Sequence, residues 1–183
     1  KDLTIKYPIV EIGCSLWAAY CATFSVDFYL NILIACYGYG LIALALCDIE
    51  YRLVSEEHID IILMLVFSIL LYKSAPVSLN LLGYLAMYLF FISLSTLFFW
   101  LTGRQGIGVG DIKMAGILGL FHGAQACILL ILLSSVGALM WYVFHASYQS
   151  VLNKKINLTA IPFLPFLHGA SFFILISQNM GIV

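Results

Sequence analysis

Long apolar runs separated by short polar breaks occupy almost the whole of this chain, and they restrict its fold more than any other feature. Of its 183 residues, 63% are hydrophobic and 9% carry a charged side chain, a balance far from that of soluble domains. A helix needs about 20 apolar residues to cross roughly 30 Å of hydrocarbon. With glycines and charges as breaks, we count six full spans and one short one (112–121), at about residues 9–26, 28–47, 59–72, 78–101, 112–121, 124–148 and 160–177. The sequence therefore predicts an all-α, polytopic transmembrane bundle that forms a single membrane-embedded domain over residues 1–183.

The charge and cysteine content exclude several classes of protein. A net charge of −1, without a long basic or acidic run, argues against a nucleic-acid partner and against a helix that only lies on a membrane surface. The five cysteines stand in apolar surroundings and show no C-x-x-C spacing, so we predict neither a zinc site nor a disulfide framework. The four histidines are scattered at helix ends, and we assign none of them to a metal or to catalysis. The expected partners are the lipid bilayer and another molecule embedded in it.

Lysine and arginine are concentrated in alternate polar segments, which predicts an orientation. Short loops rich in these residues stay on the cytoplasmic side of a membrane. If the N-terminus is cytoplasmic, the outer segments hold only Lys73, and the inner ones hold Lys1, Lys6, Arg52, Arg104, Lys113, Lys154 and Lys155. The same count favours treating the short run as a crossing or half-crossing. Under this topology Asp48 and Asp111 both lie at cytoplasmic ends of helices, at similar depth.

A glycine-rich break at residues 106–113 introduces one of these acids. An acid at membrane depth costs several kcal/mol unless it is paired, neutralised or hydrated, so Asp111 is a candidate functional residue. Glycine lets backbone approach a ligand closely and adopt conformations closed to other residues. We therefore expect Gly106, Gly108 and Gly110 to form a surface against which an extended substrate lies.

Two carboxyl groups that converge from different helices suggest a specific chemistry. Two carboxylates a few ångström apart cannot both ionise cheaply, so they share a proton, and one acts as a base while the other acts as an acid. This is the arrangement of aspartic proteases, in which the base activates water and the acid protonates the leaving amine. Such a reaction needs no metal and no organic cofactor.

Simpler interpretations of the same residues stay open at this point. The glycine stretch is also typical of a flexible loop between helices, and Asp111 suits the N-cap of a helix. Asp48 is equally consistent with an interfacial residue in water. A non-enzymatic transporter or channel that uses Asp48 and Asp111 as a proton or cation site is a further alternative, although transporters place such acids nearer the midplane and within internal repeats, which this sequence lacks.

Three segments resemble the type IV prepilin peptidases, the bacterial members of the Gly-x-Gly-Asp intramembrane aspartic proteases. Residues 106–119 are similar to that family's signature around its second catalytic aspartate. Residues 6–11, Lys-Tyr-Pro-Ile-Val-Glu, resemble its Arg-Tyr-Pro-Leu-Val-Glu segment, and residues 161–166, Ile-Pro-Phe-Leu-Pro-Phe, resemble its Ile-Pro-Phe-Gly-Pro-Phe segment. The resemblance covers nearly the whole chain. It implies that Asp111 is the second catalytic aspartate and Asp48 the first, because Asp48 begins a block like the family's Asp-x-x-x-x-x-Ile/Leu-Pro-Asp.

The resemblance also implies a substrate and a location. The substrate is a type IV prepilin or pseudopilin, cut after a glycine between its short basic leader and an apolar helix, at the cytoplasmic face of the bacterial inner membrane. We hypothesise that the acids gathered near Asp48 attract the basic leader electrostatically, and these are Glu50, Glu56, Glu57 and Asp60. Lys113 either pairs with an acidic residue of the substrate, lowers the pKa of Asp111, or extends its ammonium group to the lipid headgroups. The alternative for this group of charges is ordinary solvated interfacial charge.

Two departures from the family pattern qualify these expectations. The family's Pro-Asp falls on Ser55-Glu56, so we expect a looser helix start there. The long members carry a cytoplasmic zinc loop with two C-x-x-C pairs, which this sequence lacks, so we expect a short member or a fragment. Methylation of the new N-terminus, which bifunctional members perform, stays open. A related Gly-x-Gly-Asp protease acting on preflagellin-like or other membrane proteins remains an alternative.

Overall fold

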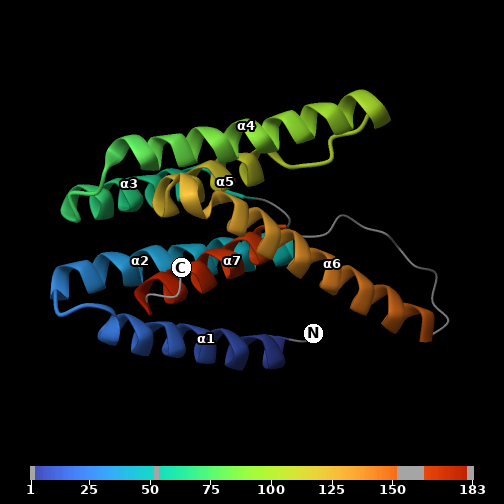
Figure 1. Cartoon of the computed structure of the whole chain (residues 1–183). Coiled ribbons are helices and arrows are strands. Elements are labelled where there is room, and N and C mark those ends of the chain that lie inside the picture. The colour runs from blue at the N-terminus through green and yellow to red at the C-terminus, as the bar shows by residue number, and fades with distance from the viewer. Residues whose placement is uncertain (1–2, 52–53, 152–162, 181–183) are drawn as a thin grey trace.

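The structure is a computed structural model that describes residues 3–51, 54–151 and 163–180. The described residues form α-helices and one short 3-10 helix, with no strand among them, which confirms the all-α prediction (Figure 1). The helices are α1 (Leu3–Phe24), α2 (Phe28–Tyr51), α3 (Glu56–Tyr72), α4 (Val77–Thr102), α5 (Val109–His122), α6 (Cys127–Val151) and α7 (Leu164–Asn179), with the 3-10 turn at Ala124–Ala126.

Each predicted run corresponds to one helix, but several boundaries differ because polar residues are tolerated in terminal turns. α2 continues through Asp48 to Tyr51, whereas the prediction ended it at Cys47. α5 begins at Val109 rather than at residue 112, so Asp111 lies inside its first turn. α7 begins at Leu164, with Pro165 in its first turn, where the missing N–H of proline costs no helical hydrogen bond.

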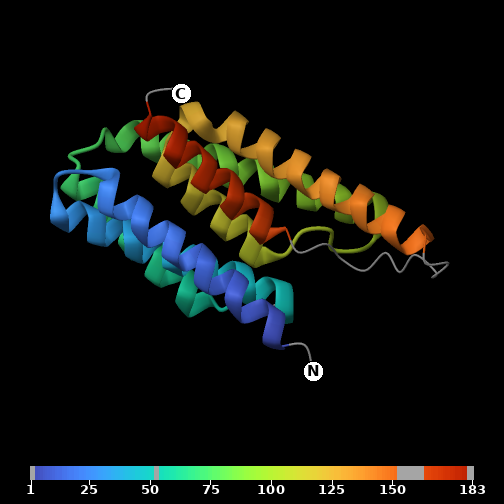
Figure 2. The ribbon, with the colours of Figure 1, turned by 90° about the horizontal axis from the view of Figure 1, so that it is seen from below.

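The helices pack in layers around α5. α4 packs on α5, α5 contacts α3 and α7, and these two helices contact α2. α1 lies on the far side of α2 (Figures 1 and 2). α6 packs mainly on α7 and crosses the bundle obliquely. Most of α5 is buried, from Ile112 to His122, because it contacts α3, α4 and α7 together.

Small residues bring α4 and α5 close together, as expected for helices packed in lipid. A Cβ atom at Gly83 would meet the backbone oxygen of Gly119, and a Cβ at Gly119 would lie 2.7 Å from Cγ of Met87. Nearby, the Asn80 side chain donates a 2.7 Å hydrogen bond to the backbone oxygen of Leu120. These contacts fix the helix that carries Asp111 against α4.

The outer surface of the bundle is apolar. Three segments of the described chain, Phe28–Tyr51, Val77–Thr102 and Ala124–Tyr148, are long and apolar enough to cross a membrane. Large apolar side chains such as Trp100 and Phe144 are exposed on α4 and α6, where a soluble protein would carry charge. The chain is therefore a helical membrane protein.

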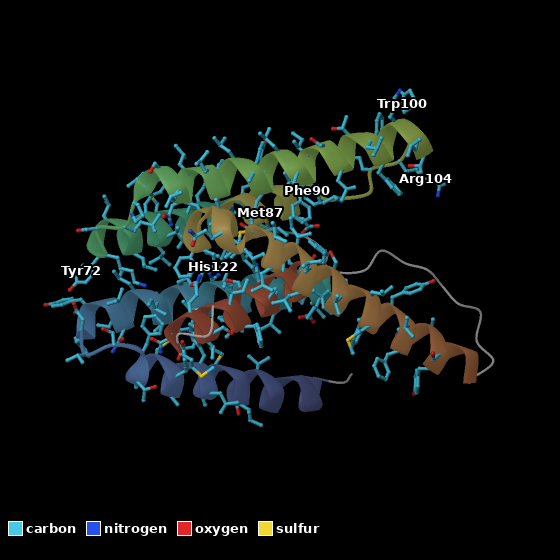
Figure 3. All side chains as sticks on the ribbon, viewed as in Figure 1. Tyr72, Met87, Phe90, Trp100, Arg104 and His122 are labelled. Atoms are coloured by element: carbon cyan, nitrogen blue, oxygen red, sulfur yellow. The ribbon has the colours of Figure 1, made fainter. Side chains whose placement is uncertain are left out.

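The two ends of the bundle differ in their charged groups. At one end, Tyr72 of α3 donates a short hydrogen bond to Asp27 in the turn before α2, and the Lys73 ammonium lies over the Phe24 ring. At the other end lie the last turn of α4, with Trp100, and the neighbouring Arg104 (Figure 3). The C-terminal end of α2 and the first turns of α3, α5 and α7 meet at this second end (Figure 1).

Candidate active site

Asp48 lies in the last turn of α2 and is buried, with 7% of its surface exposed. The backbone N–H of Leu164, the first residue of α7, donates to its Oδ2 at 3.3 Å. Asp48 thus lies at the N-terminus of α7, where the helix dipole favours negative charge. This contact could not be predicted from the sequence, because it joins residues that are 116 positions apart.

Asp111 is the third residue of α5 and reaches back to the start of its own helix. The N-cap is Gly108, and the Gly108 backbone N–H donates to the Asp111 carboxylate. An acid at this position commonly accepts the N-cap N–H in this way. The alternative that Asp111 is itself the N-cap is therefore wrong, because α5 begins two residues earlier, at Val109.

The structure brings the two acids to the same end of the bundle. The Asp48 carboxyl group lies close enough to that of Asp111 for their charges to interact, although α2 and α5 are separated in sequence by α3 and α4. Repulsion of this kind is expected to favour a pair that holds one proton between them. Such a pair offers a base and an acid at the same end of the bundle.

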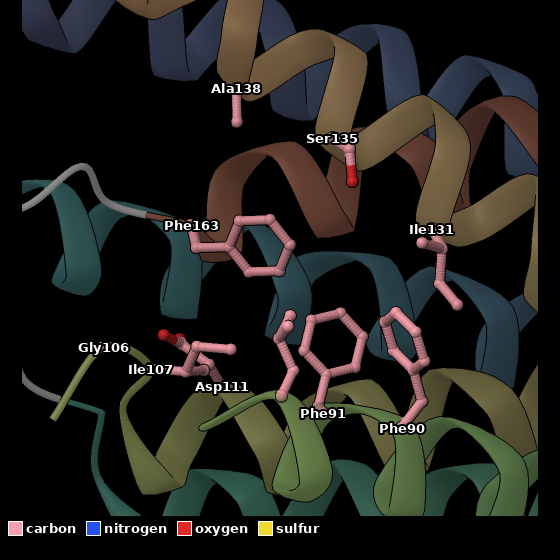
Figure 4. Close-up of a pocket in the computed structure, with 10 residues that line it drawn as sticks. Phe90, Phe91, Gly106, Ile107, Asp111, Ile131, Ser135, Ala138 and Phe163 are labelled. Carbon is pink, nitrogen blue, oxygen red and sulfur yellow. The ribbon is translucent and has the colours of Figure 1, made fainter. Parts of the chain in front are cut away.

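Asp111 also forms part of the wall of a pocket of about 380 Å³. Ligand pockets range from about 300 to 1,000 Å³, so the volume is at the small end. In Figure 4 the Asp111 carboxylate lies at one side of the pocket beside Ile107, and the aromatic rings face the interior. The lining residues come from α4, α5, α6 and two connecting segments, and they are Phe90, Phe91, Leu94, Gly106, Ile107, Asp111, Ile131, Ser135, Ala138 and Phe163. The pocket is thus largely apolar and has an acid in its wall.

The three predicted glycines have different surroundings. A Cβ at Gly110 would lie 2.9 Å from Cβ of Val54, and one at Gly106 would overlap the Phe98 ring. A Cβ at Gly108 would make only an ordinary contact, 3.4 Å from Oδ2 of Asp111. None of the three has a positive φ, so the expectation of a conformation closed to other residues is wrong. Gly106 and Gly110 instead allow close packing of the segment that leads into α5.

The predicted substrate-binding charges lie close to one another beside this site. Lys113 Nζ and Glu56 Oε1 form an exposed ion pair at 2.7 Å, which links α5 to the start of α3. Lys113 lowers the pKa of Glu56, mainly through this hydrogen bond. Glu57 is exposed in the same first turn of α3. Ser55 is the N-cap of α3 but makes no side-chain capping bond.

Some sequence expectations lie outside the described residues. These are Lys1, Arg52, Lys154 and Lys155 of the orientation argument, and Ile161 and Pro162 of the 161–166 segment. Of that segment, Phe163 lines the pocket and Leu164 contacts Asp48. The segment is noticeable in the sequence only because it resembles a prepilin peptidase segment, and neither residue was predicted to belong to the site.

The pocket walls on α4 and α6 were missed altogether. The residues concerned lie within predominantly apolar runs, where no local signal separates a lining residue from one that faces lipid, and they are Phe91, Ile131, Ser135 and Ala138. Within the described part of the chain, no group of three or more His, Cys, Asp or Glu side chains is arranged to hold a metal ion.

Comparison with known proteins gives one consistent result. Prepilin leader peptidase/N-methyltransferases of Stutzerimonas stutzeri, Pseudomonas putida and Pseudomonas aeruginosa are 32%, 30% and 31% identical to the chain over 91%, 91% and 88% of its length. The chain covers 56%, 57% and 55% of those proteins, so it spans little more than half of their length. No solved structure matches. A model of the type IV leader peptidase family matches residues 33–143. On this match and these relatives, the chain belongs to the type IV leader peptidase family.

Proposed function

We propose that this chain is an intramembrane aspartic endopeptidase that removes the leader of a type IV prepilin or pseudopilin, with Asp48 and Asp111 as its catalytic pair. The observation that carries the proposal is the meeting of these two acids, from α2 and α5, at one end of a membrane bundle beside an apolar pocket. The relatives named as prepilin leader peptidases support the choice of substrate.

The reaction follows from the pair of carboxyl groups. One carboxylate takes a proton from a water molecule, whose oxygen attacks the carbonyl carbon of the scissile peptide bond. The protonated partner donates a hydrogen bond to the developing oxyanion and then transfers its proton to the leaving amine nitrogen as the C–N bond breaks. The products are a new carboxyl terminus on the leader and a new amino terminus on the mature protein, and a proton again lies between the acids.

The surroundings of the pair fit a substrate that is half apolar and half basic. Asp111 is open to the aromatic pocket, which suits an apolar side chain next to the bond that is cut. Glu57 and Asp60 lie exposed on the first turns of α3, close to the start of α5, where a basic leader would find opposite charge. Lys113 is engaged by Glu56, so it acts on the substrate only if that pair opens.

The orientation belongs to the same proposal. Arg104 and Lys113 lie at the end of the bundle that holds the acids, and Lys73 lies at the opposite end. With the positive-inside rule, this arrangement supports a location of the acids at the cytoplasmic face of the inner membrane. We confine the proposal to peptide hydrolysis, because the relatives whose names include a methyltransferase extend well beyond the aligned region.

Leader processing in cells tests the proposal. A prepilin is co-expressed with the wild type or with Asp48→Asn or Asp111→Asn, and the shift of the leader is followed on a gel, with an immunoblot for the enzyme in membranes. Asp27→Asn is a matched control, because it changes an acid at the opposite end and asparagine still caps a helix. We expect processing by the wild type and Asp27→Asn only. Processing by either of the other variants at wild-type level would refute the catalytic pair.

A further inference from the structure

The first turn of α7 has one N–H group that its own helix does not satisfy. The first four N–H groups of a helix have no partner one full turn earlier. In α7, Pro165 has no N–H, and the N–H groups of Phe166 and Leu167 both bond to the backbone oxygen of Phe163 at 3.1 and 3.2 Å. The Leu164 N–H remains, and it donates to Oδ2 of Asp48.

This hydrogen bond is inaccessible to water. The Leu164 residue is fully buried and Asp48 nearly so. A buried donor without a partner is costly, and water cannot enter easily to replace the carboxylate. The start of α7 and the side chain of Asp48 therefore hold each other in place.

The two acids differ in what holds them. Asp111 is bound by the N-cap of its own helix and lines the pocket. Asp48 is bound by a different helix and is not among the residues that line the pocket. The placement of α7, a helix that supplies neither acid, therefore contributes to the position of the Asp48 carboxylate.

We propose that the backbone N–H of Leu164 is a positioning group of the active site, which holds the Asp48 carboxylate in the orientation required for it to act with Asp111. The inference rests on the proposed function. It makes the N-terminus of α7 part of the catalytic apparatus through a single backbone donor. Because the donor acts through Asp48 and not on the substrate, its loss lowers kcat and leaves KM unchanged.

Replacing single amides by esters tests this directly. Leu164 is exchanged for its α-hydroxy analogue, which replaces the N–H by an oxygen and keeps the side chain. The same exchange at Leu167 is the matched control, since Leu167 is also a fully buried leucine of the same turn and loses only a bond to Phe163. Cleavage of a purified prepilin by the full chain in detergent is measured for both, together with the unfolding temperature.

We expect kcat of the Leu164 ester to fall roughly 10- to 100-fold below that of the Leu167 ester, the range for loss of a hydrogen bond to a charged group, with equal KM. Equal kcat values for the two esters, or a loss confined to KM, would overturn the inference. Asp48→Asn is measured in parallel. If that variant stays active, the proposed function itself fails, whatever the esters do, so the two failures are distinguishable.

Discussion

At the level of single residues, the site combines two buried or half-buried acids with an exposed ion pair. Asp48 and Asp111 each accept a hydrogen bond from a backbone N–H group, which helps to orient the two side chains. The ion pair of Glu56 and Lys113 is open to solvent instead, so salt screens it and it contributes little to stability. We therefore expect substitutions of the acids to affect chemistry and substitutions of the ion pair to affect substrate binding and local order.

The Glu56 pair has a predictable pH dependence. Its folded pKa is below the ordinary value of 4.5, so its stabilising contribution is complete above pH 4.5 and is lost as the pH falls through the lowered pKa. The unfolding temperature of Glu56→Gln should be slightly below that of the wild type at pH 7, and the difference should vanish in acid. Glu57→Gln, a change in the same turn, is the control and should show a smaller difference at pH 7. A difference for Glu56→Gln that grows in acid would contradict the assignment.

At the level of elements, the pocket lies between α6 and the closely packed pair of α4 and α5. α4 supplies Phe91 and α6 supplies Ala138, while α5 supplies the acid. The small side chain of Ala138 is needed to leave space between α6 and the aromatic wall. A larger residue at position 138 should reduce the volume of the pocket without contacting Asp48.

Filling the pocket should change selectivity. We expect Ala138→Phe to lower kcat/KM about tenfold for a prepilin with a bulky apolar residue next to the cleaved bond, and to lower it less when that residue is alanine, since pocket fit discriminates apolar groups by a few kcal/mol at most. Leu139→Phe, at a neighbouring exposed position, is the control. Equal losses for both substrates would show that this pocket does not receive that side chain.

The elements also show what the sequence could predict. Apolar runs, with glycines and charges as breaks, located all seven helices, and the placement of charges put Asp48 and Asp111 at one end. The end of α2 was placed too early, because a polar turn at a membrane boundary still forms helix. The contact between Leu164 and Asp48 could not be predicted, because a leucine contributes only its backbone there and apolar periodicity does not report such a bond.

At the level of the whole molecule, the chain is a bundle whose charged groups divide between two ends. Lys73 and Asp27 lie at one end, and Arg104, Lys113 and both acids lie at the other. Central α5, of 14 residues, is only about 21 Å long, too short to cross the hydrocarbon alone. The surrounding helices therefore carry the contact with lipid.

This division predicts the accessibility of the two ends. In a background without native cysteines, a membrane-impermeant thiol reagent should label Ser74→Cys in intact spheroplasts and should label Arg104→Cys only after permeabilisation. Because Arg104→Cys removes a positive charge, Gln105→Cys at the next position serves as a control that leaves the charge unchanged. Labelling of Gln105→Cys in intact spheroplasts would place the acids on the outer face and contradict the proposed orientation.

The central claim is that Asp48 and Asp111 act as one catalytic unit, and the most direct test is a double-mutant cycle on kcat. Residues that act as a unit show strongly non-additive losses. We predict that Asp48→Asn, Asp111→Asn and the double variant all reduce kcat for prepilin cleavage to the same background level, with each protein folded in detergent. The two acids do not form the catalytic pair if the fold-reduction in kcat of the double variant equals the product of the fold-reductions of the two single variants. The same conclusion follows if one single variant retains wild-type kcat.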